Sequence, residues 1–253
     1  MCSYNGGKQK IGKRLSSVIL RKSENSNLIN YCEPFCGMLG VYQHLVEHFK
    51  GVKLAGDVNE SVIEMWKSAQ KGWIPPTFVS EDEFNMLKQE KGESAIKGYV
   101  GHQYSFGGQY FEGYAPKYGK TSDSTRASQK VCNIARKCED VIFTPSPYNQ
   151  FSNLKGFVIY CDPPYQILRG SKIQGTCYKH CNHFDYEAFW NWCREMSKEN
   201  MVFVSNYTAP DDFEEIFSLD RRLTGNNISD RKRVEKLFLI MTNDKCVIKE
   251  ENQ

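Results

Sequence analysis

A strand, a glycine turn, a helix and a second strand ending in an acid follow one another near the start of the chain, and this order constrains the fold most. Residues 28–32 predict a short strand, after which Gly37 permits a tight turn before an apolar-periodic helix over 41–49. A second strand over 52–56 ends at Asp57, twenty positions after the glycine. This order is typical of a nucleoside-binding βαβ unit, in which the acid hydrogen-bonds ribose hydroxyls.

A second motif follows the apolar run 157–161, which predicts a buried strand. The next four residues are Asp162, Pro163, Pro164 and Tyr165. Ligands bind at the carboxyl ends of strands in open α/β sheets, so we expect these residues in a ligand site. The Asp162 carboxylate and the Pro163 carbonyl are acceptors that match the two hydrogens of a nucleobase amino group, and the tyrosine ring can stack on the base. The tetrapeptide alone fits a plain turn equally well.

The rest of the pattern predicts an α/β fold. Strands and helices alternate on both sides of residues 60–140, which indicates one doubly wound sheet interrupted by an inserted module. Three further helices are expected: one passes through Met65 and Trp66, one begins at a capping box of Ser80 and Glu83, and one begins at the N-cap Asp185. Further strands are expected over 140–143, 201–204 and 234–241, and the last is expected to run antiparallel at an edge of the sheet. A helix-spaced aromatic set is expected in the core and at its rim: Tyr186, Phe189, Trp190 and Trp192.

Charge is nearly balanced, since 33 Lys and Arg against 30 Asp and Glu give a net charge of +3 over 253 residues. The total therefore does not indicate a nucleic-acid binder, and any basic surface must be local. Residues 8–22 contain no acid, and residues 221–233 hold a second basic stretch. Residues 101–130 predict a surface loop or hairpin that mixes rings and cations, as nucleic-acid contacts do. Those side chains are Tyr104, Phe106, Tyr110, Phe111, Tyr114, Lys117, Tyr118, Lys120 and Arg126.

The chain holds ten cysteines, but no charged and then apolar leader follows Met1, so we expect reduced thiols in an intracellular protein. No apolar run approaches the roughly 18 residues that a spanning helix needs, so we expect a soluble protein without membrane contact. Four residues have zinc-binding side chains: Cys177, His180, Cys181 and His183. They are crowded and lack a second CxxC pair, so we favour a loop with reduced thiols and expect no metal.

Five motifs in this order resemble the Dam-type, D12-class N6-adenine DNA methyltransferases, and the resemblance spans most of the chain. The motifs are Tyr-Asn-Gly-Gly-Lys at 4–8, Glu-Pro-Phe-Cys-Gly at 33–37, Asp-Val-Asn at 57–59, the DPPY motif at 162–165 and Val-Ser-Asn-Tyr at 204–207. The resemblance implies a Rossmann-like S-adenosylmethionine-dependent methyltransferase sheet formed by residues 1–62 and 141–253. It also implies a mostly helical target-recognition subdomain over 63–140, with a hairpin that reaches the DNA major groove.

The same resemblance assigns roles to individual residues. It implies that S-adenosylmethionine, whose product is S-adenosylhomocysteine, is contacted by Tyr4, Lys8, Asp57 and Asp162, in a pocket lined by Phe35, Cys36 and Gly37. It implies that the catalytic residues Asp162, Pro163, Pro164 and Tyr165 hold a flipped-out adenine. The candidates for gripping the DNA backbone are Lys117, Lys120, Arg126 and the N-terminal basic stretch.

Two positions depart from the family pattern. Leu39 stands at the second glycine of the usual Phe-x-Gly-x-Gly motif, with Gly40 directly after it. Tyr4 stands where a tryptophan is usual, which keeps an aromatic ring. The leucine changes the cofactor loop, although Gly40 can still relax the turn.

The predicted reaction is site-specific methyl transfer to N6 of a flipped-out adenine in double-stranded DNA. Alternatives are an adenine in RNA, a protein glutamine amide, for which the related motif usually begins with Asn, and a catalytically silent DNA-binding relative. A structural protein with a zinc clip at 177–183 is a further alternative. The sequence leaves open the recognition sequence, a restriction-modification role with a partner endonuclease, and the choice between monomer and homodimer.

Overall fold

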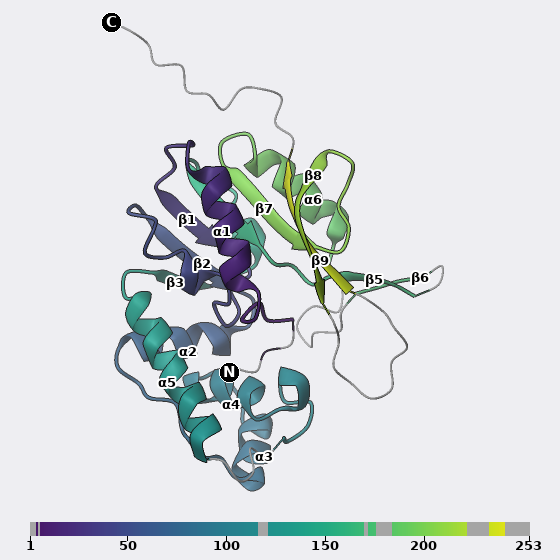
Figure 1. Ribbon diagram of the computed structural model, residues 1–253. Helices are drawn as coiled ribbons and strands as arrows, with labels where there is room; N and C mark the ends of the chain where they lie inside the picture. The colour runs from purple at the N-terminus through teal and green to yellow at the C-terminus, as the bar shows by residue number, and fades with distance from the viewer. Residues whose placement is uncertain are drawn as a thin grey trace, which may run out of the picture.

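The computed structural model describes residues 4, 6–115, 121–169, 172–175, 184–221 and 233–240. One seven-stranded sheet forms its centre (Figure 1), in the order β3-β2-β1-β4-β7-β9-β8. Its strands are β1 (Asn30–Glu33), β2 (Lys53–Asp57), β3 (Ile142–Pro145), β4 (Phe157–Cys161), β7 (Met201–Asn206), β8 (Phe213–Arg221) and β9 (Arg233–Ile240). A separate antiparallel hairpin pairs β5 (Gln166–Arg169) with β6 (Lys172–Gly175) and projects from the sheet.

The first five strands of this order run parallel, and β9 runs antiparallel between β7 and β8. The order reverses between β1 and β4, which are neighbours in the sheet although the insertion separates them along the chain. A ligand crevice forms outside the carboxyl ends of the strands at such a switch point. The sheet therefore has the Rossmann-like methyltransferase fold, and the predicted fold class is confirmed.

Helices cover the sheet and form a second region at one end of it (Figure 1). They are α1 (Gly12–Ser23), α2 (Glu60–Gln70), α3 (Glu81–Gln89), α4 (Ala95–Gln103), α5 (Thr121–Lys137) and α6 (Tyr186–Met196), with 3-10 turns η1 (Tyr42–His44), η2 (Phe106–Gly108) and η3 (Tyr148–Phe151). Between β2 and β3, α2 packs on α4 and α5, so the region is helical as expected. The proposed boundary at residue 63 falls inside α2, and the target-recognition role of residues 63–140 stays a prediction.

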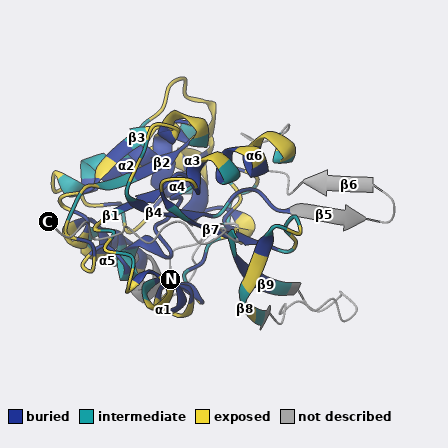
Figure 2. Cartoon of the chain, turned by 90° about the horizontal axis from the view of Figure 1, so that it is seen from above, coloured by how far each residue is buried: buried dark blue, intermediate teal, exposed yellow. Residues whose placement is uncertain are grey.

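Several local predictions are confirmed. Ser80 and Glu83 form the capping box of α3, and Asp185 accepts a hydrogen bond from the third residue after it at the start of α6. Phe189 and the two tryptophans of α6 are buried. Figure 2 shows that α6 carries both buried and exposed residues.

Among the described residues, no helix combines the length and the apolar character that a membrane span requires.

Two predictions about regular structure are wrong. The segment 41–49 is not an α-helix, because only η1 forms there and its hydrogen bonds mostly join residues three apart. β-branched and aromatic side chains give this segment weak helix propensity, and turns bury the same apolar residues. The last strand, β9, is not at the edge, because β8 pairs along its outer side.

The interpretation of residues 101–130 as a surface loop is also wrong in part. Residues 101–103 end α4, and α5 begins at Thr121. Tyr104 and Phe111 are buried in the core, whereas Phe106 is exposed. Gly101 allows the burial of Phe111, since a Cβ there would lie 2.5 Å from the Tyr110 ring and 2.7 Å from the Phe111 ring. The missing side chain lets two rings pack directly on α4.

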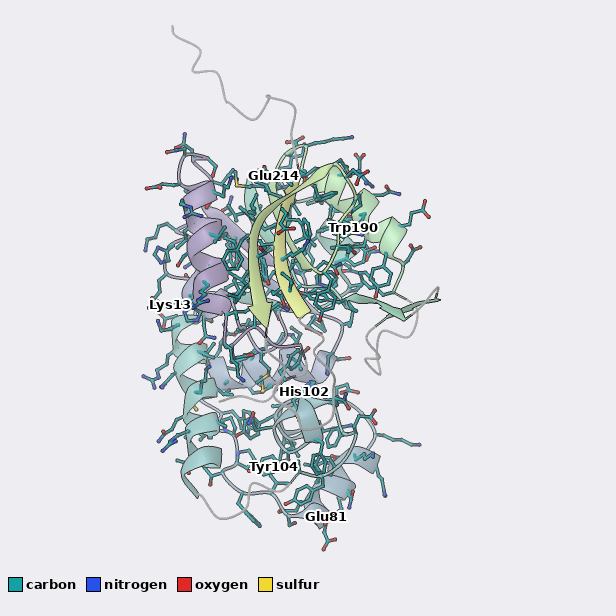
Figure 3. The ribbon with its side chains drawn as sticks, turned by 45° about the vertical axis from the view of Figure 1, so that its right-hand side comes forward. Lys13, Glu81, His102, Tyr104, Trp190 and Glu214 are labelled. Carbon is teal, nitrogen blue, oxygen red and sulfur yellow. The ribbon has the colours of Figure 1, made fainter. Side chains whose placement is uncertain are left out.

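The basic stretch near the N-terminus folds as α1, which was not anticipated as a helix. Leu15 and Ile19 are buried on one face, while Lys13 and Arg14 are exposed on the other. Figure 3 shows Lys13 on the outer side of α1. The cations of α1 are thus the solvated side of an amphipathic helix that covers the sheet.

Candidate active site

The glycine turn and the DPPY motif lie side by side at one edge of the sheet. The turn follows β1 and Asp162 follows β4, and these two parallel strands are paired from Asn30 with Phe157 onward. The carboxyl ends of the two strands are therefore neighbours, and residues 33–37 lie beside residues 162–165. Pro163 and Pro164 are buried there.

Lys8 links the N-terminal segment to the DPPY motif. Its ammonium donates to Asp162 Oδ1 at 2.6 Å and to the Gly6 carbonyl at 3.1 Å. The same ammonium lies 4.7 Å from the centre of the Tyr165 ring, within the range of a cation–π contact. Two residues predicted to contact the cofactor are therefore a buried ion pair.

Tyr165 is held on several sides. Its hydroxyl donates to Glu235 Oε1, and its ring meets the Tyr207 ring edge-on at 4.7 Å. Glu235 lies on β9 and is fully buried, and sequence reasoning missed it. A signal was present, because Glu235 shares the inward face of its strand with Leu237, where alternation calls for an apolar residue.

The glycine turn is fixed by Asp57. The Gly37 N–H donates to Asp57 Oδ2 at 2.9 Å, and the Asn59 N–H donates to Oδ1 at 2.8 Å. Gly37 has a φ of +44°, which a side chain would disfavour. The glycine and the acid, twenty residues apart, are thus in direct contact. Asp57 therefore fixes the backbone of the turn at two positions, Gly37 and Asn59.

Leu39, which stands at the second glycine position of the usual motif, has a left-handed backbone conformation that glycine adopts more easily. Leu39 has a φ of +53° and a fully buried side chain, and its N–H donates to the Cys36 carbonyl at 2.8 Å. Gly40 has a different purpose, since a Cβ on it would lie 3.0 Å from the Lys8 backbone. The N-terminal segment can therefore lie directly against the turn.

Tyr4 lies between the glycine turn and the helical region. A Cβ on Gly37 would approach the Tyr4 ring to 3.0 Å, and the centre of that ring is 4.5 Å from the centre of the His102 ring. His102 belongs to α4, and Figure 3 shows it where the helices meet the sheet, with Tyr104 farther out. The Nε2 atom of His102 is 3.4 Å from the side-chain amide nitrogen of Asn59. One aromatic residue thus contacts both parts of the molecule.

The other predicted pocket residues differ in exposure. Phe35 is half-buried and packs on the rings of Tyr148, Phe184 and Phe189, at centroid distances of 5.7, 6.0 and 5.7 Å. Cys36 is buried, and its N–H donates to the Gly56 carbonyl at 2.8 Å, which ties the turn to β2. The Phe35 ring therefore ends an aromatic cluster beside the glycine turn.

Burial and mutual repulsion disfavour the charged forms of the acids in the site. Burial raises the pKa of Asp162, the Lys8 ammonium opposes this, and the Glu235 carboxylate raises the pKa further. Burial also raises the pKa of Glu33 well above its usual value, against the effect of the hydroxyl of Tyr31, which donates to Glu33 Oε1 at 2.6 Å. A cluster of this kind favours binding of a cation.

Only some of the residues predicted to contact DNA are among those that the structure describes. Arg126 is exposed on α5, and Lys117 and Lys120 lie outside the described residues. The zinc candidates at 177–183 also lie outside them. Within the described residues, no group of three or more His, Cys, Asp or Glu is arranged to hold a metal ion.

No family model matches the chain. It is similar to TrmN from Thermus thermophilus at 9% identity, over 90% of this chain and 49% of that one, with a TM-score of 0.40. It is also similar to yhhF from Escherichia coli, a proposed methyltransferase, at 8% identity over 90% and 86% of the two chains, with a TM-score of 0.37. HI0767 from Haemophilus influenzae, a proposed methylase, has 10% identity over 91% and 99%, with a TM-score of 0.37. The chain spans about half of TrmN. Likenesses this weak carry no argument, and the strand order alone defines the fold.

Proposed function

We propose that this chain transfers a methyl group from S-adenosylmethionine to N6 of an adenine flipped out of double-stranded DNA. The observation that carries the proposal is the position of Asp162, at the carboxyl end of β4 and beside the turn that Gly37 and Asp57 form. A carboxylate at the end of a strand, next to a turn of the nucleoside-binding type, places a hydrogen-bond acceptor for an amine close to a cofactor pocket.

The residues present fit the cofactor. Gly37 lacks the side chain that would fill the turn, and Asp57 stands at the strand end where the acid of a nucleoside-binding unit accepts hydrogen bonds from ribose hydroxyls. The buried acids near Lys8 suit the cationic part of the molecule, and Phe35 offers an apolar ring beside the turn. When bound, S-adenosylmethionine supplies an electrophilic methyl group on a sulfonium.

Asp162 and Pro163 would orient the acceptor amine. Their oxygens accept its two hydrogens, so the nitrogen lone pair points at the methyl carbon and forms the new N–C bond. The electron pair of the broken C–S bond stays on sulfur, and the extra proton on nitrogen passes to Asp162 and then to solvent. Such orientation contributes on the order of 7–11 kcal/mol to lowering the barrier. Extruding the base costs a few kcal/mol, which pocket and phosphate contacts must offset.

One experiment tests the substrate and the reaction together. The protein is expressed in a host without DNA methylation, and N6-methyladenine is mapped by single-molecule sequencing. The proposal expects methylated adenines in one sequence context. In parallel, the purified protein is given tritiated S-adenosylmethionine with unmethylated DNA or with RNA. Label in RNA but not in DNA, or cofactor binding without transfer to either, would contradict the proposal.

A further inference from the structure

The Lys8 ammonium lies between two carboxylates from distant parts of the chain. Its nitrogen is 2.6 Å from Asp162 Oδ1 and 3.5 Å from Glu235 Oε1. The Lys8 side chain is 4% exposed, Glu235 is 0% exposed and Asp162 is 19% exposed. The acid that faces the site thus shares its cation with an acid that water does not reach.

This sharing matters because a carboxylate that is paired with an ammonium is a weaker acceptor for the hydrogens of the amine and a weaker base for its proton. In the present arrangement Oδ1 already accepts a hydrogen bond from Lys8. A buried ammonium that simply left Asp162 would lose its partner, which is strongly unfavourable. Glu235 removes this obstacle, since its oxygen lies only 3.5 Å from the same nitrogen. A small movement of Lys8 exchanges one carboxylate for the other.

The surroundings of Glu235 suit this use. Its strand, β9, lies between β7 and β8, so the carboxylate is enclosed by the sheet. Burying a carboxylate costs several kcal/mol, and an amide or an apolar side chain would pack there more cheaply. Glu235 also accepts from the Tyr165 hydroxyl, so it contacts the DPPY motif in a second way.

We propose that Glu235 is a positioning residue for methyl transfer: it receives the Lys8 ammonium when Asp162 turns its carboxylate to the amine of the acceptor base. The inference rests on the proposed function and adds a residue to the site. Glu235 touches neither substrate nor cofactor and acts through Lys8. The Glu235 carboxylate also holds the Lys8 ammonium close to Asp162, so that the Lys8–Asp162 ion pair can form again after the methylated base leaves.

Glu235→Gln is the informative change, because glutamine keeps the volume and an oxygen acceptor for Tyr165 but removes the charge. We expect kcat to fall roughly tenfold to a hundredfold, as for other residues that orient a reacting group through a neighbour. KM for S-adenosylmethionine and the affinity for S-adenosylhomocysteine should stay near the wild-type values. The matched control is Glu215→Gln. Glu215 is an exposed acid on β8, and its carboxylate is paired at 2.6 Å with the Lys236 ammonium on β9. This control should leave kcat, KM for S-adenosylmethionine and the affinity for S-adenosylhomocysteine unchanged.

A binding measurement separates positioning from a general structural effect. The target duplex is prepared with adenine or with purine, which lacks the amino group, and affinities are measured with S-adenosylhomocysteine present. Wild type should prefer adenine, because Asp162 accepts its hydrogens. Glu235→Gln should reduce this preference, because Lys8 then stays on Asp162. An unchanged preference together with wild-type kcat would overturn the inference.

A double-mutant cycle with Lys8→Met keeps the test decisive if Glu235→Gln folds poorly. Removing both members of a buried charge pair is less destabilising than removing one. Since Glu235 acts through Lys8, adding Glu235→Gln to the Lys8→Met variant should lower kcat no further. Additive losses would refute the mechanism. Absence of adenine methylation by wild type would instead contradict the proposed function itself.

Discussion

The Trp66 indole N–H donates to the Gly37 carbonyl at 2.9 Å, so α2 holds the turn that follows β1. Both groups are buried, and Trp66 is fully enclosed. The turn is therefore fixed from two directions, by Asp57 on its N–H and by Trp66 on its carbonyl.

Trp66→Phe should loosen the turn. The change leaves a buried carbonyl without its donor, which costs about 1–3 kcal/mol. We expect a lower melting temperature and weaker binding of S-adenosylhomocysteine by calorimetry. The control is Trp192→Phe, which loses a comparable indole bond to Ser152 Oγ at 3.0 Å, away from the site. Equal cofactor affinity in the two variants would argue against this role for Trp66.

Asp162→Ala should abolish methyl transfer while the protein stays folded and still binds DNA. Removing the acceptor for the amine should lower kcat by about a hundredfold or more. Tritiated-methyl transfer measures the loss, and circular dichroism checks the fold. Asp212→Ala removes a carboxylate paired with Arg194 at 2.6 Å and serves as the matched control. Near-normal turnover by Asp162→Ala would disprove the assignment.

Leu39→Gly should destabilise the protein even though it restores the glycine of the family pattern. A glycine would relieve about 1–2 kcal/mol of left-handed backbone strain. Loss of the fully buried leucine side chain costs more, about 2–5 kcal/mol. Chemical denaturation should therefore show a lower free energy of unfolding. A gain in stability would mean that the strain exceeds the packing contribution.

Glu33→Gln should change how stability depends on pH. Burial, followed by the nearby Asp162 charge, raises the Glu33 pKa, and only the Tyr31 hydrogen bond opposes this. A carboxyl with a raised pKa in the folded state stabilises at low pH, and this contribution is lost as pH rises through that pKa. Between the ordinary pKa of 4.5 and the raised pKa of Glu33, the free energy of unfolding of wild type should therefore fall relative to that of the variant by up to about 1.4 kcal/mol per pH unit. Urea denaturation from pH 5 to 9 measures the difference; parallel curves would contradict the prediction.

The sequence predicted those parts of the site that local patterns encode. β4 was predicted with its observed bounds because five apolar residues precede Asp162 directly. The glycine turn after β1 and the acid at the end of β2 were predicted from their spacing, whereas the direct hydrogen bond between Gly37 and Asp57 was not. The start of α6 was predicted because its cap, Asp185, is local to the helix.

What the sequence did not predict depends on contacts between distant segments. Glu235 meets Tyr165 only because β9 lies inside the sheet, and that position requires pairing with β8, whose acids obscure the strand pattern. Phe111 was expected at the surface because nothing near it in sequence shows that its ring packs on Gly101 of α4.

The position of β9 gives the chain an order of assembly. Among the described strands, β8 pairs with β9 and not with β7, so β8 cannot join the sheet before β9 has left the ribosome. Until then Lys8 and Asp162 are without Glu235, although every other described member of the site is already synthesised. The sheet and the charge arrangement of the site are therefore completed by the same late event, and a nascent chain stalled before β9 would carry an incomplete site.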